Sequence, residues 1–335
     1  MLKIKKLHNI HFKKSGILIS LGIISAGLFL YFYVPLFVIE IKNPFIEIAR
    51  TYVLKEKKLK INKEEVTPIQ WKGANKVLLS GNFYPARQQP AQASIILVHG
   101  IRSQKEVWDT TARWLQQKGF NAITIDLRAH GNSQGSYCTY GYYEKEDISK
   151  LVDFLISNYK LKTPIGIWGH SLGGAISLQA LAIDNRLQFG IIESAYANFE
   201  KITKDYSDYY LSFHLDPLNK FVIERAGEMA CFNPEDINPE TYCNQIHQPV
   251  LLLHGKNDQK INYKNALKNF EALKSENKKL ILIEQGHHTD ILLKGGEKIK
   301  TEILNFLKEN TTRNPSLTIS AFDQNSDHIY YNNLI

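Results

Sequence analysis

Runs of apolar residues rich in Ile, Val and Leu recur along the chain, and several of them are unbroken, as expected for strands buried on both faces of a sheet. Stretches with helical patterning lie between most of these runs. The strand-like runs are KVLLSGNFY (76–84), SIILVHG (94–100), FNAITID (120–126), PIGIWGH (164–170), FGIIESA (189–195), PVLLLHG (249–255) and KLILIEQG (279–286), and the helical stretches are 105–118, 143–158, 172–183, 262–274 and 295–309. This alternation predicts an α/β fold with a mostly parallel central sheet flanked by helices.

The interval 196–248 is longer than a single crossover helix requires. Its aromatic residues recur at loosely helical spacing; they are Tyr206, Tyr209, Tyr210, Phe213 and Phe221. We therefore expect a small helical insertion. It is either a lid over a substrate pocket, which we favour, or an ordinary insertion packed on its own aromatic residues.

A span without charged residues covers 15–39, which is 25 residues long. Roughly 20 apolar residues cross a bilayer as a helix, so the span predicts a transmembrane anchor. Lysines at 3, 5, 6, 13 and 14 precede it, which by the positive-inside rule keeps the N-terminus in the cytoplasm and places the rest of the chain on the extracytoplasmic side. A cleaved signal peptide is the alternative, but its apolar region would be only about 7–15 residues, and no good small-residue cleavage site follows.

The formal net charge of +8 comes from the first part of the chain, because residues 1–60 hold 11 Lys or Arg and 3 Asp or Glu. The remainder is balanced, which argues against a nucleic-acid partner and for a membrane flank. We expect a cytoplasmic stub and anchor over 1–40, a linker over 41–60, a globular domain over 61–310 with the insertion at about 196–248, and a polar tail over 311–335. The sequence leaves the oligomeric state open.

Three cysteines, Cys138, Cys231 and Cys243, do not form a disulfide framework. Cys231 and Cys243 could pair in an oxidising compartment, or all three could be isolated thiols. No spacing in the sequence is typical of a zinc site, so we expect no metal and no organic cofactor.

The segment Gly169-His170-Ser171-Leu172-Gly173-Gly174 follows an apolar strand and opens a helical stretch. Gly-x-Ser-x-Gly between strand and helix is the pattern of a nucleophile elbow, in which glycines leave room for a sharply turned serine. A glycine-rich turn that only packs helix on strand is the alternative. We predict that Ser171 is a nucleophile.

A serine nucleophile needs a base and an orienting acid, which follow it in the order Ser, acid, His in this kind of fold. Asp258 comes directly after a buried strand and is the predicted acid, ahead of Glu284 and Asp290. The loop EQGHHTD (284–290) offers two histidines, of which only one can face Ser171. We predict His287 as the base, because Gly286 precedes it and the helix start follows His288.

The loop after SIILVHG and the residue after the serine are expected to donate backbone N–H groups to an oxyanion, which points to Ile101 and Leu172. His99 and His170 are interpreted as residues that shape the site. The segment IDLRAHGNSQGS (125–136) lacks the spacing of a phosphate-binding loop and is expected to be a structured turn, with Asp126 and Arg128 paired.

Together GHSLGG, LVHG, DLRAHGNSQG, PVLLLHGKND and QGHH resemble the motifs of the α/β-hydrolase superfamily, in particular its serine-aminopeptidase-like branch, over about residues 60–310. Several members of that branch have an N-terminal membrane anchor. The resemblance implies a Ser–Asp–His hydrolase without a cofactor. It also implies that the catalytic histidine directly follows a glycine, which again selects His287. It does not fix the substrate, since the branch includes esterases, lipases, thioesterases and peptidases.

We therefore expect a membrane-anchored serine hydrolase that cleaves a small-molecule or lipid-like acyl ester. A thioesterase or serine peptidase is the alternative within the same chemistry. An acyltransferase and a catalytically silent scaffold are the alternatives from other classes.

Overall fold

The structure is a computed structural model that describes residues 19–42, 66–161, 163–211 and 216–312. Residues 1–18 of the expected stub and anchor, residues 43–60 of the expected linker over 41–60, and the tail beyond 312 lie outside the described residues. So do the side chains of Tyr209, Tyr210 and Phe213 in the predicted insertion.

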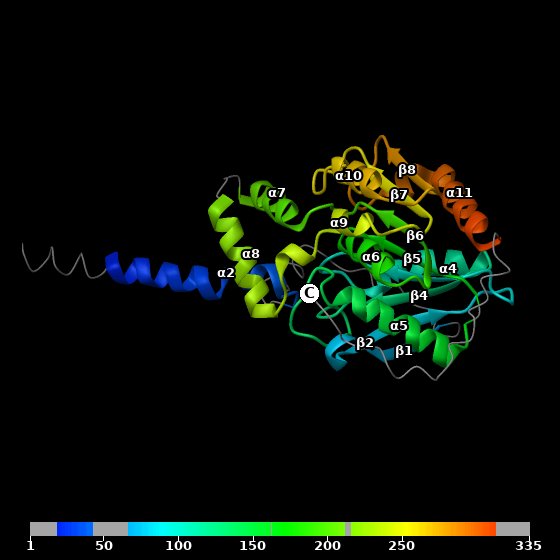
Figure 1. Cartoon of the computed structure of the whole chain (residues 1–335), viewed down its shortest axis with the longest axis horizontal. Coiled ribbons are helices and arrows are strands. Elements are labelled where there is room, and N and C mark those ends of the chain that lie inside the picture. Colours follow the sequence, from blue (N-terminus) through cyan, green and yellow to red (C-terminus); the bar gives the residue numbers. More distant parts are fainter. Residues whose placement is uncertain (1–18, 43–65, 162, 212–215, 313–335) are drawn as a thin grey trace, which may run out of the picture.

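An eight-stranded sheet lies at the centre of the fold, in the order β1-β2-β4-β3-β5-β6-β7-β8 (Figure 1). Its strands are β1 (Thr67–Lys72), β2 (Leu78–Tyr84), β3 (Ser94–Val98), β4 (Asn121–Asp126), β5 (Ile165–His170), β6 (Leu187–Glu193), β7 (Val250–Gly255) and β8 (Lys278–Ile283). The pairs β1–β2 and β2–β4 are antiparallel, and all later pairs are parallel. The predicted mostly parallel sheet is confirmed.

Helices cover both faces of this sheet, because alternate residues of each buried strand point to opposite sides. In β3, Ile96 and Val98 pack in the core under α5 and α6, whereas Ile95 and Leu97 pack in the core under α4 and α11. The helices are α2 (Val34–Ile39), α4 (Asp109–Gln117), α5 (Glu144–Tyr159), α6 (Leu172–Ile183), α7 (Phe199–Leu211), α8 (Asp216–Ala230), α9 (Pro239–Cys243), α10 (Lys264–Ala272) and α11 (Ile291–Thr312), with short 3₁₀ turns η2 (Ala74–Lys76), η3 (Lys105–Trp108) and η4 (Pro234–Asp236).

The edge strand β1 was not among the predicted strands. Its sequence TPIQWK buries only Ile69 and Trp71, in an alternating pattern, because one of its faces meets solvent. An edge strand of this kind leaves no apolar run in the sequence.

The interval between β6 and β7 contains α7, α8, η4 and α9. α7 and α8 lie at one end of the molecule, beside the helix that begins near the N-terminus (Figure 1). That helix runs over Ile19–Ile39, with α2 as its last section, and within the described residues it alone is long and apolar enough to cross a membrane.

Candidate active site

Ser171 lies in the sharp turn between β5 and α6, with φ 57° and ψ −119°. This conformation is costly for a residue other than glycine, so the surrounding structure must hold it. The Ser171 N–H donates to the Glu193 carbonyl oxygen at 2.8 Å. A side chain at Gly169 would clash with Gly173, since a Cβ there would lie 2.2 Å from the Gly173 oxygen. The glycines therefore allow the close packing that the elbow pattern predicts.

The ring next to Ser171 is that of His288. Its Nε2 lies 2.9 Å from Ser171 Oγ, and its Nδ1 lies 2.8 Å from Asp258 Oδ2. All three side chains are buried or nearly so. The serine, the histidine and the carboxylate therefore form one hydrogen-bonded chain.

The prediction that His287 faces Ser171 is wrong. The His287 N–H donates to Asp290 Oδ1 at 2.6 Å, and its ring nitrogen Nδ1 donates to Asp290 Oδ2 at 3.1 Å. The His287 side chain is 56% exposed, against 10% for His288. The reason is the path of the loop. Gly286 is used in a turn that packs directly on Gly255, so the first residue that can point inward is His288.

Asp258 follows β7, as predicted, and every lone pair of its carboxylate faces a donor. Oδ1 accepts the N–H groups of Lys260 and Ile261, both at 2.9 Å. Oδ2 lies 2.8 Å from His288 Nδ1 and 3.3 Å from His254 Nε2. Burial by itself would raise the pKa of Asp258, but hydrogen bonds from His254 and His288 outweigh it and hold that pKa well below its usual range. The carboxylate is therefore ionised and oriented.

His254 was not singled out in the sequence. It is fully buried, and its Nε2 also lies 2.8 Å from the Ile261 carbonyl oxygen, which requires a proton on that nitrogen. The position inside the apolar run PVLLLHG is the signal that could have found it, because a histidine in a buried strand needs partners.

His170 holds the loop that carries His288. Its Nε2 donates to the His288 carbonyl oxygen at 2.7 Å, and the two ring centroids are 5.1 Å apart. Burial, helped by the neighbouring His288, lowers the pKa of His170 to about 4, so the ring is neutral near pH 7. These contacts agree with its interpretation as a residue that shapes the site.

Glu193, at the end of β6, is a buried carboxyl group next to the elbow. Its Oε1 accepts the Trp168 indole N–H at 2.9 Å. Burial raises the pKa of Glu193 to about 7, and the hydrogen bond from Trp168 opposes that rise. The sequence signal was an acidic residue inside the apolar run FGIIESA, which sequence reasoning passed over.

The loop after β3 runs past Ser171. A Cβ built at Gly100 would lie 3.3 Å from Ser171 Cβ, and Ile101 and Leu172 border the same cavity as the serine. Leu172 is the first residue of α6, so its N–H belongs to the first helical turn, which has no intrahelical acceptors. Both residues are thus near enough to Ser171 to remain the predicted oxyanion donors.

Two neutral histidines fix this loop. His99 Nδ1 donates to the Gly100 oxygen at 2.7 Å, and its Nε2 accepts the Leu127 N–H. The Arg102 N–H donates to His130 Nε2 at 3.2 Å. Burial lowers the pKa of His99 to about 4 and that of His130 to about 3. His99 therefore supports the loop through both ring nitrogens.

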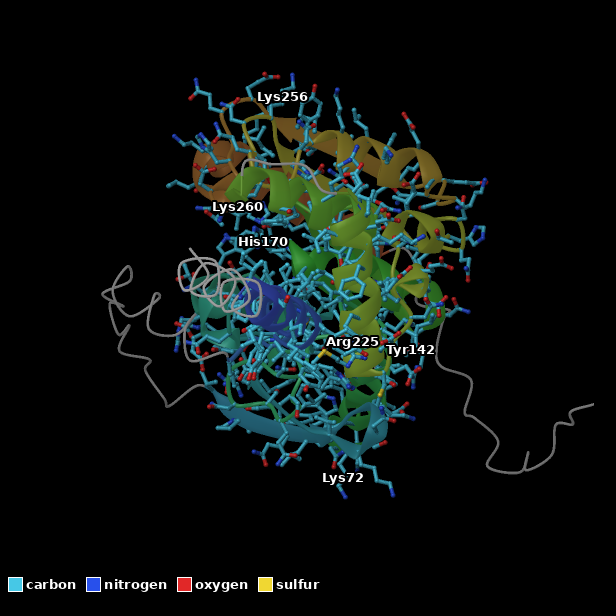
Figure 2. All side chains as sticks on the ribbon, turned by 90° about the vertical axis from the view of Figure 1, so that its left-hand side faces the viewer. Lys72, Tyr142, His170, Arg225, Lys256 and Lys260 are labelled. Atoms are coloured by element: carbon cyan, nitrogen blue, oxygen red, sulfur yellow. The ribbon has the colours of Figure 1, made fainter. Side chains whose placement is uncertain are left out.

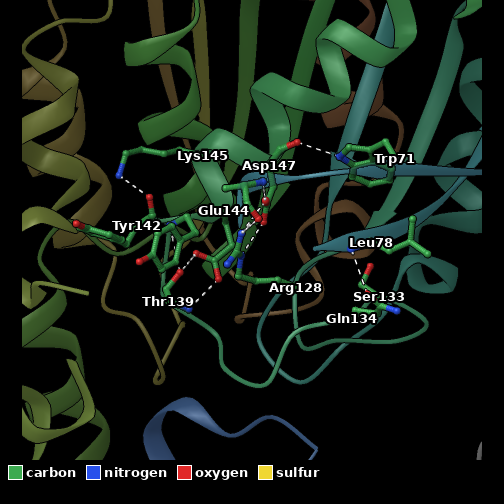
Figure 3. A network of polar contacts seen from close by, with 12 residues as sticks. Trp71, Leu78, Arg128, Ser133, Gln134, Thr139, Tyr142, Glu144, Lys145 and Asp147 are labelled. Atoms are coloured by element: carbon green, nitrogen blue, oxygen red, sulfur yellow. Dashed lines mark hydrogen bonds and ion pairs between the residues drawn. The ribbon is translucent and has the colours of Figure 1, made fainter. Parts of the chain in front are cut away.

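The prediction that Asp126 and Arg128 pair is wrong. The chain turns after β4, so their side chains point toward different elements. Asp126 accepts Lys105 Nζ at 2.6 Å, whereas Arg128 binds both carboxylate oxygens of Asp147 in α5, at 2.8 and 2.7 Å. Figure 3 shows Arg128 beside Asp147, whose backbone oxygen accepts the Trp71 indole N–H. The segment is a structured turn, tied to the sheet edge and to α5.

Two cavities meet at Ser171. One, of about 660 Å³, is bordered by Ile101, Leu172, Tyr196 and residues of α2, α7 and α8. The other, of about 680 Å³, is bordered by His99, His170, Glu193, Lys260 and His288. Tyr206 of α7, in the predicted insertion, borders both. The serine hydroxyl is therefore accessible from an apolar side and from a more polar side.

The three cysteines are free thiols, with Cys138 and Cys243 buried and Cys231 exposed. Across the part of the chain that the structure describes, no group of three or more His, Cys, Asp or Glu side chains is placed to hold a metal ion.

A nucleophile elbow on a mostly parallel sheet, facing a histidine and an aspartate from later loops, defines the α/β-hydrolase class. Comparison with known proteins gives the same class. Residues 89–209 match the family described as serine aminopeptidase, S33. An esterase of Pyrococcus furiosus superposes with a TM-score of 0.62 at 24% identity, covering 74% of this chain and 92% of that one.

Among curated proteins, the uncharacterized protein YqkD of Bacillus subtilis is 28% identical over 219 residues, which are 64% of this chain and 70% of YqkD. Human monoglyceride lipase is 24% identical over 230 residues, which are 59% of this chain and 75% of the lipase. These comparisons show the α/β-hydrolase fold and support a hydrolase.

Proposed function

We propose that this protein is a membrane-anchored serine hydrolase that cleaves an acyl ester through an acyl-enzyme on Ser171. The observation that carries the proposal is the hydrogen-bonded chain from Ser171 through His288 to Asp258. A serine hydroxyl is a weak nucleophile near pH 7, and a histidine oriented by a carboxylate activates it.

In the proposed reaction, His288 Nε2 takes the proton from Ser171 Oγ as that oxygen attacks the ester carbonyl. Asp258 holds the proton on Nδ1 and stabilises the imidazolium that forms. The backbone N–H groups of Ile101 and Leu172 bind the oxyanion. His288 then gives its proton to the leaving alkoxide, and the alcohol departs.

Water, deprotonated by the same ring, attacks the acyl-enzyme in the second half of the cycle. The tetrahedral intermediate that forms then collapses to a carbonyl, the bond to Ser171 breaks, and the Ser171 oxygen recovers the proton from His288. The products are one alcohol and one carboxylic acid, and the enzyme returns to its starting state.

The two cavities at Ser171 favour an ester over a substrate with a free peptide N-terminus. Recognition of a peptide N-terminus requires a carboxylate to hold the ammonium group. Among the described residues that border the two cavities, Glu193 is the acidic one, and it is already engaged by Trp168. The apolar cavity suits an acyl group, and the more polar one suits the alcohol part.

The helix over Ile19–Ile39 supports the membrane part of the proposal, since it is apolar and mostly exposed. From this helix and the lysines before it, we infer a single membrane span, with the N-terminus in the cytoplasm and the hydrolase domain outside. α7 and α8 take the role of the lid, because both border the apolar cavity.

Steady-state hydrolysis of p-nitrophenyl butyrate, of its thioester analogue and of an aminoacyl p-nitroanilide tests the proposed reaction. We expect turnover of the ester, and loss of several orders of magnitude in kcat for Ser171→Ala. Turnover of the anilide alone, or an ester rate that Ser171→Ala leaves unchanged, would reject an esterase that uses this serine.

A further inference from the structure

The end of the N-terminal apolar helix forms part of the cavity beside Ser171. Val34, Phe37 and Val38, all from α2, border the same 660 Å³ space as Ser171 and Leu172. The proposed lid also borders this space, through Ile202 and Tyr206 of α7 and Leu218 and Val222 of α8. A segment expected to act only as an anchor therefore reaches the reacting serine.

Hydrogen bonds fix this end of the helix to the hydrolase domain. Three backbone oxygens of α2 accept donors from two loops of that domain: Phe37 from Arg102 Nη2 at 2.7 Å, Val38 from Tyr140 Oη at 2.5 Å, and Ile39 from the Cys138 N–H at 2.9 Å. Ile39 and Ile41 are also buried in the core that includes β2 and α5. The structure thus sets the positions of the three side chains that border the cavity.

Three hydroxyl groups around this cavity have backbone partners. The hydroxyl of Tyr140 donates to Val38, that of Tyr196 to the Tyr140 oxygen, and that of Thr203 to the Phe199 oxygen. What remains to face the space is mostly hydrocarbon. Each methylene buried in such a space improves binding by about fourfold, so a long acyl chain would bind there much better than a short one.

The same helix is exposed just before it reaches the cavity. Ile19, Ile23 and Phe29 are 64%, 68% and 53% exposed, whereas Pro35 and Ile39 are buried. An exposed apolar surface of this kind is normally buried against a partner. The length and composition of the helix fit a lipid bilayer as that partner. The change from lipid-facing to protein-facing side chains thus falls where the helix begins to border the cavity.

Aromatic residues lie where the helix passes from exposed to buried, as they do where transmembrane helices leave a bilayer. Tyr31 meets the proposed lid there: the Arg225 guanidinium of α8 lies 4.1 Å from the centre of its ring, and the Phe221 ring lies 6.3 Å away. Figure 2 looks onto this face, with Arg225 on α8 next to the N-terminal helix. The apolar cavity therefore lies next to the level at which the helix enters the membrane.

We infer that α2 is a wall of the acyl-binding cavity, and that the substrate is an ester of a long acyl chain drawn from the bilayer in which Ile19–Tyr33 lies. Val34, Phe37 and Val38 then determine which acyl chain lengths are accepted. The inference rests on the proposed ester hydrolysis at Ser171. The inference adds the class of substrate to that proposal and makes the end of the anchor helix part of the substrate site.

The test compares kcat/KM for p-nitrophenyl butyrate, laurate and palmitate, using the full chain reconstituted in phospholipid vesicles. The wild type should prefer laurate to butyrate. Val34→Trp and Val38→Trp fill the cavity and should lower the laurate-to-butyrate ratio by about tenfold or more. Phe37→Ala enlarges the cavity and should shift the preference toward palmitate. Leu28→Trp is the matched control, because Leu28 is 54% exposed on the same helix and does not border the cavity, so it should leave the profile unchanged.

A wild type that prefers butyrate, or ratios within about twofold of wild type in Val34→Trp, Val38→Trp and Phe37→Ala alike, would overturn the inference while ester hydrolysis stands. If the tryptophan variants do not fold, the shift expected for Phe37→Ala decides. Failure of the proposed function gives a different result, since butyrate hydrolysis by the wild type would then be absent or insensitive to Ser171→Ala.

Discussion

At the scale of single residues, the pair His287–His288 shows where sequence reasoning reaches its limit. The motif placed a histidine in the correct loop, but the choice between neighbours depends on distant contacts. Gly286 packs on Gly255, and His170 holds the backbone oxygen of His288 from the elbow. Neither contact leaves a local pattern. By contrast, Ser171 follows β5 directly and Asp258 lies in the loop after β7, so the elbow motif and the strand pattern together could predict them.

Exchange of the two histidines for alanine separates their roles. His288→Ala should lower kcat for p-nitrophenyl butyrate by several orders of magnitude, because Ser171 loses its hydrogen-bond partner and base. His287→Ala should change kcat by less than about tenfold, since its ring is hydrogen-bonded to Asp290 and not to Ser171. Steady-state kinetics of the two variants checks this. The reverse order of effects would restore the original choice of His287.

Glu193→Gln tests the buried carboxyl group. Burial raises the pKa of Glu193 to about 7, against an ordinary value of 4.5, so the folded protein holds a proton there that the unfolded chain releases. This stabilisation is fully present below pH 4.5 and is lost as the pH rises to about 7. The free energy of unfolding changes by roughly 3 kcal/mol over this pH range. The Gln side chain still has an oxygen that accepts the Trp168 N–H, but it does not ionise as the pH rises.

We therefore expect the free energy of unfolding of Glu193→Gln, relative to wild type, to rise between pH 4.5 and 7 and to level off above. Urea denaturation at several pH values measures it. Parallel pH profiles for the two proteins would show that the wild-type carboxyl group titrates normally.

At the scale of elements, apolar runs predicted the seven strands β2 to β8. The buried parallel strands among them are the clearest runs, because they are apolar on both faces. β1 was missed because one face meets solvent. The pairing of Arg128 was also missed, since its partner Asp147 belongs to α5 and no spacing along the chain relates the two. Long-range polar contacts of this kind must be seen in the structure.

Asp147→Ala should destabilise the protein by about 3–5 kcal/mol, because it leaves the buried Arg128 guanidinium unpaired. The carboxylate also accepts the Ala74 N–H at 2.8 Å, so η2 between β1 and β2 loses a contact as well. Chemical denaturation measures the change. Glu297→Ala is the control: it removes the exposed pair with Lys300 and should cost less than about 1 kcal/mol. Equal effects of the two substitutions would contradict a structural role for the buried pair.

At the scale of the whole molecule, the order of strands and helices made the fold predictable from the sequence. The apolar cavity was not predictable, because α2 is far from α7 and α8 in the chain and meets them only in space. The sequence pointed to an anchor and to an insertion separately. Their contact across the cavity joins them into one proposed substrate site.

The inferred topology predicts where each end of the chain lies. A reporter that folds only after export should be active when fused to the C-terminus, and a reporter that works only in the cytoplasm should be silent there. The same two reporters fused to the N-terminus form the control and should give the opposite pattern. A strong cytoplasmic signal from the C-terminal fusion would reverse the orientation derived from the lysines.

The central claim is that Ser171 is a nucleophile activated by His288 and Asp258. A fluorophosphonate probe, followed by mapping of the labelled peptide by mass spectrometry, tests it most directly. We expect the wild type to carry the label on Ser171, Ser171→Ala to carry none while keeping its melting temperature, and His288→Ala to label far more slowly than His287→Ala. Label on another residue, or equal labelling of wild type and Ser171→Ala, would contradict the account.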